Sequence, residues 1–454
     1  MVGVRVPASF YRGGTSRGLL FRAADLAPYA PSTRDAIICA AMGSPDPDGR
    51  QIDGLGGGVS SLSKAAMISK PGKGFYTKIL RELGDQWKLP GVEWADDAER
   101  AAHPRKGWDI VYRFGQVPIN SATVDWGSTC GNMLAAVGLF ALHNELVDPA
   151  FFARKKLKYQ KSIRLPIRIL MAATGKRATV TLPLDKIRRN GVTTYDLSRN
   201  DDTSISGVPG QAPGIQVSIP LDSSPLPTGN MRDTLEIHGK SIPVTIADAG
   251  IPTIFVHASD IGVSTEQMVQ SAAALDQDQD LHKRIETLRR QAAQLTPKLA
   301  ADFCSSAPKV VLVHAKSPYT SSAGNHIAAE DMDLLVRPIS VGQFHRSIMA
   351  TALSAIAVAN AFPDSIVREA SNSRLSHQGE QEDAQFTINV GHAAGTASAT
   401  VQLDKGRPTS IVFMRTARRI MEGSVDIPWS VAQRWGEPYA DYFERSKRLP
   451  YNKP

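Results

Sequence analysis

Two stretches of this sequence are apolar on every face that a helix would present. They span residues 132–143 (NMLAAVGLFALH) and 347–362 (SIMATALSAIAVANAF), one in each half of the chain. A helix without a polar face has to be buried on all sides. Because short strand-like segments surround both stretches, the sequence predicts an α/β protein in which a mixed sheet wraps around a central helix, twice. Two separate α/β layers with ordinary core helices are the alternative on this pattern alone.

The length of the chain also indicates two domains. Its 454 residues exceed what one ordinary core holds. A polar stretch at 185–202 separates the strand-like segments of the two halves, so we place the boundary near Asn190. This gives an N-terminal domain of residues 1–190 and a C-terminal domain of residues 191–454, whose last strand could return to the first domain. Residues 265–300 are predicted to form one long amphipathic helical region.

Composition narrows the class of protein. Hydrophobic residues make up 42% and charged residues 21% of the chain, as in globular proteins. No run reaches the roughly 18 apolar residues of a membrane span. The three cysteines, Cys39, Cys130 and Cys304, are odd in number and widely spaced, which argues against a disulfide framework or a cysteine-based metal site. We therefore expect a cytoplasmic protein with no metal and no membrane partner.

The formal charge of +8 favours anionic partners. The basic residues are scattered, and their densest cluster, at 154–164, lacks any nucleic-acid-binding pattern. We read this cluster as a solvated surface and expect no nucleic-acid partner. A small polycarboxylate bound in a cleft fits the charge equally well. A homodimer is one assembly compatible with the sequence.

Cys130 is the first candidate for chemistry. It precedes Gly131 and Asn132 at the start of the first apolar helix. The free amides at a helix N-terminus attract anions and favour a thiolate. A substrate carboxylate could bind the amides of Gly131 and Asn132, although a buried, inert cysteine is an equally common finding.

Lys64 is the second candidate. It ends the glycine- and serine-rich segment GLGGGVSSLSK at 54–64, which is neither a Walker A loop nor a dinucleotide-binding motif. Ser60 and Ser61 could donate hydrogen bonds to a carboxylate. Because the apolar stretch 65–68 follows, the Lys64 amine is expected to be partly desolvated, which lowers its pKa toward that of a general base.

Two further segments carry candidate carboxylate contacts. The turn RGGTSRG at 12–18 offers Ser16 and Arg17. The segment SVGQFHR at 340–346 offers Gly342, Gln343 and His345, and it precedes the second apolar helix as CGN precedes the first. Because it contains no cysteine, a racemase with one thiol on each side of its substrate is excluded at this pair of positions.

Together these motifs resemble the 2-methylaconitate cis-trans isomerase and aconitate Δ-isomerase family (the PrpF family). The resemblance rests on RGGTSRG at 12–18, QIDG at 51–54, GGVSSLSK at 57–64, FGQV at 114–117, CGN at 130–132 and GH at 391–392, in family order. It implies the diaminopimelate-epimerase-like fold, with two pseudo-symmetric domains and an active site between them. It also implies catalysis by Lys64 and Cys130 without a cofactor, and adds His392 to the substrate-binding candidates.

The sequence departs from the family pattern at several points. Arg17 stands where lysine is common, Thr129 where asparagine is common, and His392 lacks the usual proline and serine after it. An insert at 73–106 resembles fungal homologues. These differences affect the identity of the substrate more than the reaction class.

The resulting hypothesis is a cofactor-independent isomerase of a small unsaturated di- or tricarboxylic acid. Lys64 would remove an allylic proton, and Cys130 would serve as the partner acid or as an electrostatic element. Two alternatives are a hydrolase or acyltransferase with Cys130 as nucleophile, and a non-catalytic carboxylate-binding member of the family.

Overall fold

A computed structural model describes residues 4–70, 109–147, 160–189, 191–221, 224–237, 239–371, 383–429 and 431. The predicted insert at 73–106 and most of the basic cluster at 154–164 lie outside this part of the chain.

The first half forms a mixed sheet in which neighbours in sequence are mostly neighbours in space. Its strands are β1 (Val4–Gly13), β2 (Ser16–Arg22), β3 (Lys64–Ser69), β4 (Ile110–Gln116), β5 (Ser162–Met171), β6 (Arg177–Arg189) and β7 (Val192–Leu197). β2 runs parallel to β3 and β4 runs parallel to β5, whereas the pairs β1–β2, β3–β4 and β5–β6 are antiparallel.

The second half repeats this order of pairings. Its strands are β8 (Ile215–Pro220), β9 (Asp233–Ile237), β10 (Lys240–Asp248), β11 (Pro252–His257), β12 (Lys309–Ala315), β15 (Leu334–Ser340), β16 (Gln343–Phe344), β17 (Asp383–His392), β18 (Gly395–Asp404) and β19 (Arg407–Arg415). β10–β11 is antiparallel, β11–β12 parallel, β12–β15 antiparallel, β15–β17 parallel and β17–β18 antiparallel. The two halves are therefore related by an internal pseudo-symmetry in which β3 corresponds to β12 and β4 to β15.

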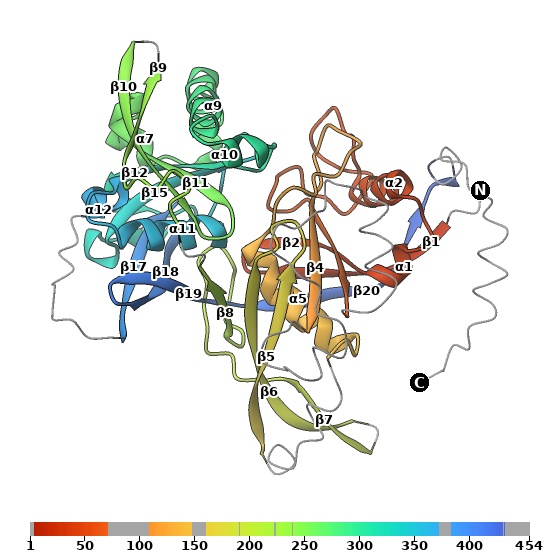
Figure 1. The fold of residues 1–454 in the computed structure, drawn as a ribbon. Coiled ribbons are helices and arrows are strands. Elements are labelled where there is room, and N and C mark those ends of the chain that lie inside the picture. The colour runs from red at the N-terminus through yellow and green to blue at the C-terminus, as the bar shows by residue number, and fades with distance from the viewer. Residues whose placement is uncertain are drawn as a thin grey trace.

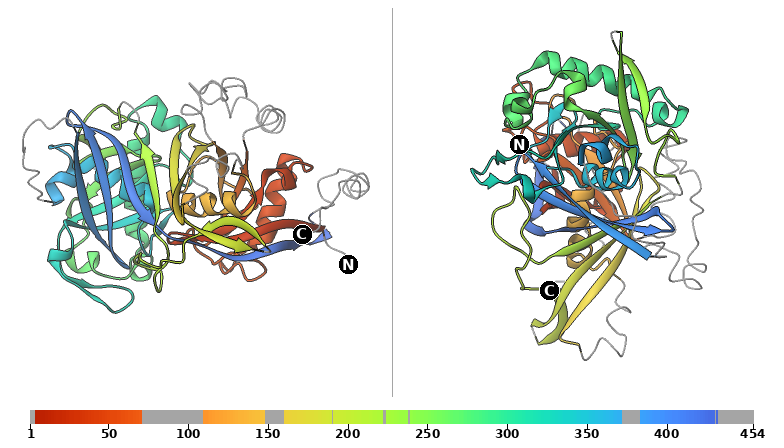
Figure 2. Two further views of the ribbon diagram at one scale, coloured as in Figure 1. Left: turned by 90° about the horizontal axis from the view of Figure 1, so that it is seen from below. Right: turned by 90° about the vertical axis from the view of Figure 1, so that its left-hand side faces the viewer.

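The last strand returns to the first half. β20 (Ala417–Ile427) follows β19 directly and pairs with β1 along its whole length. β19 and β20 thus run from one half into the other (Figure 1), and the left view of Figure 2 shows these blue strands passing between the two halves. A small separate sheet consists of β13 (Tyr319–Thr320) and β14 (His326–Ile327).

Each half encloses one apolar helix, as predicted. α5 (Gly131–His143) has every residue from Gly131 to Ala141 buried, and α11 (Ala350–Asn360) is buried throughout. The other helices that the structure describes are less completely buried. They are α1 (Ala23–Leu26), α2 (Pro31–Met42), α7 (Thr265–Met268), α8 (Ala272–Leu275), α9 (Gln279–Ala293), α10 (Pro297–Ala301), α12 (Ile366–Ser371) and the 3₁₀ turns η2 (Ala258–Ile261) and η3 (Ala329–Asp331). The predicted mixed-sheet α/β class with two pseudo-symmetric units is confirmed.

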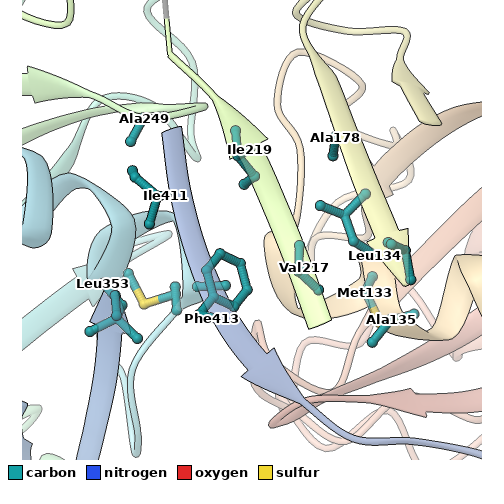
Figure 3. Packing of buried hydrophobic residues seen from close by; sticks show 14 of the residues in the cluster. Met133, Leu134, Ala135, Ala178, Val217, Ile219, Ala249, Leu353, Ile411 and Phe413 are labelled. Carbon is teal, nitrogen blue, oxygen red and sulfur yellow. The ribbon is translucent and has the colours of Figure 1, made fainter. Parts of the chain in front are cut away.

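The cores of the two halves join at β8, which pairs with β6 of the first half and with β19 of the second. Val217 of β8 lies opposite Phe413 of β19 in the register of this pair. Figure 3 shows these side chains between Met133 and Leu134 of α5 on one side and Leu353 of α11 on the other. One continuous hydrophobic cluster therefore contains both central helices.

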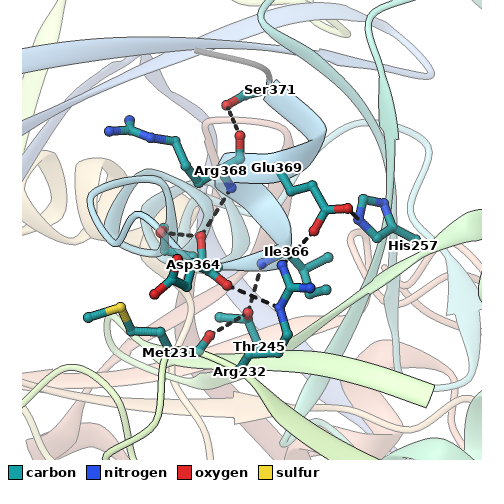
Figure 4. A network of polar contacts seen from close by, with 11 residues as sticks. Met231, Arg232, Thr245, His257, Asp364, Ile366, Arg368, Glu369 and Ser371 are labelled. Atoms are coloured by element: carbon teal, nitrogen blue, oxygen red, sulfur yellow. Dashed lines mark hydrogen bonds and ion pairs between the residues drawn. The ribbon is translucent and has the colours of Figure 1, made fainter. Parts of the chain in front are cut away.

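Polar contacts hold α12 against the strands β10 and β11. The Thr245 hydroxyl accepts the N–H of Ile366 at 2.9 Å and donates to the carbonyl of Met231 at 2.7 Å. Arg232 forms an ion pair with Glu369, which also lies within 3.5 Å of His257 (Figure 4). These bonds tie α12 to the strands that it covers.

Residues around Asn190 form the β6–β7 hairpin, and β8 pairs with β6 as well as with β19, so a division of the chain near this residue stays a prediction. Residues 122–126 contribute a single bridge, between Asp125 and Gln116. The predicted long helical region differs from the structure. The helical region at 265–300 is divided into four helices, because capping residues restart the chain (Ser264, Ser271, Asp278 and Thr296).

Truncating the second central helix tests how far the fold depends on it. Leu353 is fully buried, so Leu353→Ala should leave a cavity and lower the free energy of unfolding by about 2–5 kcal/mol. The matched variant Leu295→Ala removes a side chain that is 39% exposed and should change it by less than about 1 kcal/mol. Urea denaturation followed by circular dichroism measures both; equal losses would contradict the assignment of α11 as a core element.

Candidate active site

Lys64 is placed by the pairing of β2 with β3. It is the first residue of β3 and lies beside Gly18 in the parallel register. A Cβ at position 18 would lie only 2.3 Å from the carbonyl oxygen of Lys64. The last glycine of the RGGTSRG motif is therefore required for the close approach of these two strands.

Burial changes the acid–base properties of Lys64. Its side chain is buried, and its Nζ donates to Oε1 of Gln116 at 2.7 Å. Burial lowers the pKa of the Lys64 amine, as the sequence predicted. Gln116, the last residue of β4, donates its own amide to the carbonyls of Ser60 at 3.0 Å and Ser63 at 2.9 Å. One glutamine thus fixes both the amine and the loop before it.

Gln51 holds the same loop from the other side. Its side-chain oxygen accepts the N–H of Gly58 at 3.0 Å and the hydroxyl of Ser63, and its amide donates to Ser44 at 2.8 Å. Gln51 and Gln116 stand in the QIDG and FGQV motifs, to which the sequence analysis assigned no role. Their function is to position the segment that carries Ser60 and Lys64.

Cys130 stands at the head of α5, where the sequence placed it. It is the N-cap residue in an extended conformation, and its Sγ lies 3.9 Å from the hydroxyl oxygen of Ser16. A Cβ added to Gly131 would lie 2.8 Å from Cβ of Ala350, the first residue of α11. Gly131 therefore allows the N-termini of the two central helices to meet.

These elements enclose a cavity between the two halves. It is lined by Ser16, Ser60, Lys64, Phe114, Gln116, Ser128, Thr129, Cys130, Gly131, Ser306, Lys309, Ser340, His345, Met349 and Thr351. Six predicted site residues are thus brought together, five from the first half and His345 from the second. The Lys64 amine and the Cys130 thiol share one cavity.

The charge of this cavity is positive. Two lysines line it, the N-terminal ends of α5 and α11 adjoin it, and no aspartate or glutamate occurs among its described lining residues. A helix N-terminus carries partial positive charge and free N–H groups. The cavity is therefore suited to a ligand with more than one negative charge.

His345 contributes a neutral hydrogen-bond donor. Burial lowers the pKa of its imidazole to about 4, so the ring is uncharged near neutral pH. Its Nδ1 accepts the backbone N–H of Ser347 at 3.1 Å. The ring proton consequently resides on Nε2, which can donate to a carboxylate.

Lys309 was missed by the sequence analysis. It is the first residue of β12, it is buried, and its Nζ donates to the carbonyl of Ser306 and the hydroxyl of Ser340, both at 3.1 Å. Burial, and next to it the charge of Lys64, lowers the pKa of Lys309 to about 8. The available signal was the strand-like run KVVLVHA at 309–315, which places a lysine before an apolar strand as in β3.

Six predicted contacts lie outside the described lining of this cavity: Arg17, Ser61, Asn132, Gly342, Gln343 and His392. The guanidinium of Arg17 lies over the ring of Phe10, 5.6 Å from its centre, because successive residues of a strand face opposite sides. The N–H of Arg17 donates to the carbonyl of Ser61 at 3.0 Å, which joins that loop to β2. Gly342 and Gln343 line a neighbouring cavity that shares Lys309 with the first.

Asn132 and His392 belong to a different part of the interface between the halves. The Asn132 side chain donates to the hydroxyl of Thr15 at 3.1 Å and accepts from Nε of Arg415 at 2.9 Å, so it is already engaged. His392 lines a second cavity of about 400 Å³ together with Thr15 and Arg415. Burial lowers the pKa of His392 to about 3. Neither side chain lines the cavity of Lys64 and Cys130.

The head of the second central helix also differs from the prediction. α11 begins at Ala350 with Met349 as its N-cap, because β15 extends to Ser340 and the short strand β16 follows. The residue that corresponds to Cys130 is thus Met349, not a member of the segment 340–346. A pair of thiols at the two helix heads is absent in either alignment.

The cavity is nearly closed in this structure. Its volume of about 20 Å³ suffices for about one water molecule. A carboxylate oxygen of Asp125 in the first half accepts the hydroxyls of Ser305 at 2.7 Å and Ser306 at 2.9 Å in the second half. A ligand larger than about one water molecule therefore requires this cavity to widen.

Two features that other functions would need are absent from the described residues. No group of three or more histidine, cysteine, aspartate or glutamate side chains is arranged to hold a metal ion within them. None of their helices combines the length and the apolar character needed to cross a membrane.

Known proteins resemble this chain over nearly its whole length. A family model described as PrpF protein matches residues 3–75 and 99–428. The 2-methyl-aconitate isomerase of Shewanella oneidensis is 33% identical, covering 94% of this chain and 97% of that protein. The 2-methyl-aconitate isomerase of Cupriavidus necator is 32% identical, covering 94% of this chain and 98% of that protein. This chain belongs to the PrpF family.

A solved structure agrees with this membership. The crystal structure of a methylitaconate-delta-isomerase covers 96% of this chain and is itself covered completely, at 27% identity and a TM-score of 0.62. The family and the isomerase class predicted from the motifs are thereby confirmed. In this PrpF-family chain four of the quoted motifs, RGGTSRG, GGVSSLSK, FGQV and CGN, contribute residues to this cavity although they lie far apart in the sequence. Gln51 of QIDG supports the loop before Lys64, whereas His392 lines the second cavity.

The buried amine of Lys309 predicts a pH-dependent stability. Its pKa of about 8 in the folded state lies below the unfolded value of 10.5, so the folded chain releases this proton first. Below pH 8 both states are protonated and the full cost of burying the ammonium applies; between pH 8 and 10.5 the cost disappears. The variant Lys309→Met does not bury this amine, so it should gain stability over wild type at pH 7. At pH 10.5 that gain in the free energy of unfolding should be smaller by about 3 kcal/mol.

Urea denaturation at a series of pH values measures this difference. Lys316→Met serves as the control, because Lys316 is an exposed lysine on the same segment of chain. A stability difference that stays constant from pH 7 to 10.5 would contradict the burial of a titrating amine at position 309.

Proposed function

We propose that this protein is a cofactor-independent isomerase that shifts a proton on a small unsaturated di- or tricarboxylic acid. The observation that carries the proposal is the cavity between the two halves, where a desolvated lysine and a helix-capping cysteine meet a surface built for anions. The named relatives described above, isomerases of methylaconitate and methylitaconate, support the choice of substrate class.

Carboxylates of the substrate bind the N–H groups at the heads of α5 and α11. The hydroxyls of Ser16 and Ser60 and the Nε2–H of His345 line the same cavity and add neutral donors. Because hydrogen bonds from neutral donors and helix ends hold anions without a countercharge, the amine of Lys64 is left for proton transfer. Closure of the cavity around the acid then excludes bulk water.

Lys64 acts as the base. Burial lowers the pKa of its amine, which increases the neutral fraction near physiological pH. The lone pair of Nζ removes a proton from the carbon next to the double bond, and the electrons of that C–H bond enter the conjugated system. The charge spreads into a carboxylate as a dienolate, which the helix amides stabilise.

The product forms when a proton returns to the conjugated system. Return at the far carbon shifts the double bond, whereas rotation of the intermediate before return gives cis–trans isomerisation. Cys130 faces the substrate from the head of α5, as a partner acid or as a polar group that orients a carboxylate. No cofactor takes part in this scheme.

A cysteine hydrolase receives less support from the geometry. It needs a histidine that hydrogen-bonds the thiol. The described partner of the Cys130 thiol is Ser16, while His345 accepts from Ser347 and His143 bonds to Tyr11 at 2.9 Å. His103 lies outside the described residues. A non-catalytic carboxylate-binding protein would bind the acids tested below without converting them.

The cellular setting is also a proposal. The free cysteines Cys39, Cys130 and Cys304 fit a reducing compartment, so we infer that the protein works in the cytoplasm. The homodimer stays a prediction, which light scattering coupled to size-exclusion chromatography measures directly.

The activity is tested with a panel of acids in deuterated water. Incubation with cis-aconitate, trans-aconitate, 2-methyl-cis-aconitate, itaconate and methylitaconate, read by proton NMR, should show conversion of at least one acid with deuterium incorporation. Lys64→Ala should lower kcat by about 10²–10⁴-fold, the usual contribution of a general base. Cys130→Ser keeps a hydroxyl at the helix head and should lower the rate less than Lys64→Ala does.

Lys316→Ala is the control for loss of a lysine away from the cavity, and it should turn over like wild type. Conversion without deuterium incorporation, together with normal turnover by Lys64→Ala, would sink the proposed base. Binding of the acids with no conversion by wild type would favour the non-catalytic alternative, and a covalent acyl group on Cys130 would favour the hydrolase.

A further inference from the structure

The internal symmetry of the fold assigns a partner to Lys64. Lys64 begins β3, which is parallel to β2, and Lys309 begins β12, which is parallel to β11. β3 corresponds to β12 in the repeated order of strand pairings. The two lysines therefore occupy equivalent positions in the two halves.

Their local contacts repeat as well. Lys64 pairs in register with Gln116, the last residue of β4, and its amine donates to that side chain. The register of β12 with β15 pairs Val310 with Ile339, so Lys309 lies opposite Ser340, the last residue of β15. The Lys309 amine donates to the Ser340 hydroxyl. The equivalence thus extends from the strand to the side chain.

The surroundings of Lys309 do not suit a purely structural cation. Its hydrogen-bond partners, the Ser306 carbonyl and the Ser340 hydroxyl, are neutral. Burial of an ammonium without a paired carboxylate is costly, and a neutral side chain could join this loop to β15 at lower cost. The cost is offset when a dianion or trianion occupies the cavity that Lys309 lines with Lys64.

Lys64 and Lys309 are two amines that line one cavity, so the protonation of one affects the protonation of the other. The charge of Lys64 disfavours protonation of Lys309, as expected for like charges. The repulsion favours the state with one neutral amine and one ammonium. A proton shift along an allylic system needs this state, because one group has to accept a proton and another has to donate one.

We propose that Lys309 is a second catalytic residue, which delivers a proton to one end of the allylic system after Lys64 has removed a proton from the other end. The C–H bond at the first carbon breaks and its proton forms an N–H bond on Lys64. The double bond moves by one position, an N–H bond of the Lys309 ammonium breaks, and a C–H bond forms at the far carbon. Exchange of protons with solvent resets both amines. This inference rests on the proposed isomerase activity and gives Cys130 the role of orienting a carboxylate.

The test separates removal of the proton from its return. Wild type, Lys64→Met and Lys309→Met are incubated in deuterated water with the acid that wild type converts best. NMR measures deuterium exchange in the remaining substrate and the formation of product. Lys309→Met should keep exchange at the carbon that Lys64 attacks, within about tenfold of wild type, and lose isomerisation by about 10²–10⁴-fold. Lys64→Met should lose both.

A second variant distinguishes loss of the proton donor from a folding defect. Lys309→Arg keeps the positive charge and the hydrogen-bond donors, but a guanidinium does not release a proton in this pH range. It should show the same split between exchange and isomerisation. The inference is overturned if Lys309→Arg or Lys309→Met isomerises within threefold of wild type, or if both variants lose exchange together with isomerisation while still binding the acid. Wild type that neither exchanges nor converts any acid would instead overturn the proposed function itself.

Discussion

The heads of two buried helices meet at one point, and the site depends on this contact. Gly131 makes it possible, since a side chain there would collide with Ala350 of the other helix. Both helices direct their free N–H groups toward the same small volume. The anion-binding end of each half is therefore shared, and neither half alone contains a complete site.

The site also buries positive charge. The fold buries Lys64 and Lys309 at this point with neutral hydrogen-bond partners only. Such an arrangement destabilises the empty protein and stabilises the complex with an anion, because the ligand supplies the missing negative charge. The same burial lowers the pKa of both amines. In the proposed mechanism, binding of the polyanion and transfer of the proton therefore have one physical origin, the burial of these amines.

Internal symmetry explains how two halves with different sequences produce a matched pair of groups. Strand pairings repeat from β1–β6 to β10–β18, and the amines at the starts of β3 and β12 follow from that repeat. The helix heads have diverged, with Cys130 in one half and Met349 in the other. The divergence makes the two ends of the cavity chemically different, as the proton shift on an unsymmetrical acid would require.

The sequence by itself determined the two buried helices, the mixed-sheet architecture and the candidates Lys64 and Cys130, because each of these leaves a local signal. A helix without a polar face has to lie in the core. Cys130 directly precedes such a helix in the sequence and therefore lies at its N-terminus. It also gave the family, since several motifs coincided. Tertiary structure alone decided that Lys309 joins the site, that Arg17 turns toward Phe10, and that Asn132 and His392 face other partners. These outcomes depend on strand register and on contacts between residues hundreds of positions apart, and hydrophobic periodicity along a chain carries no information about either.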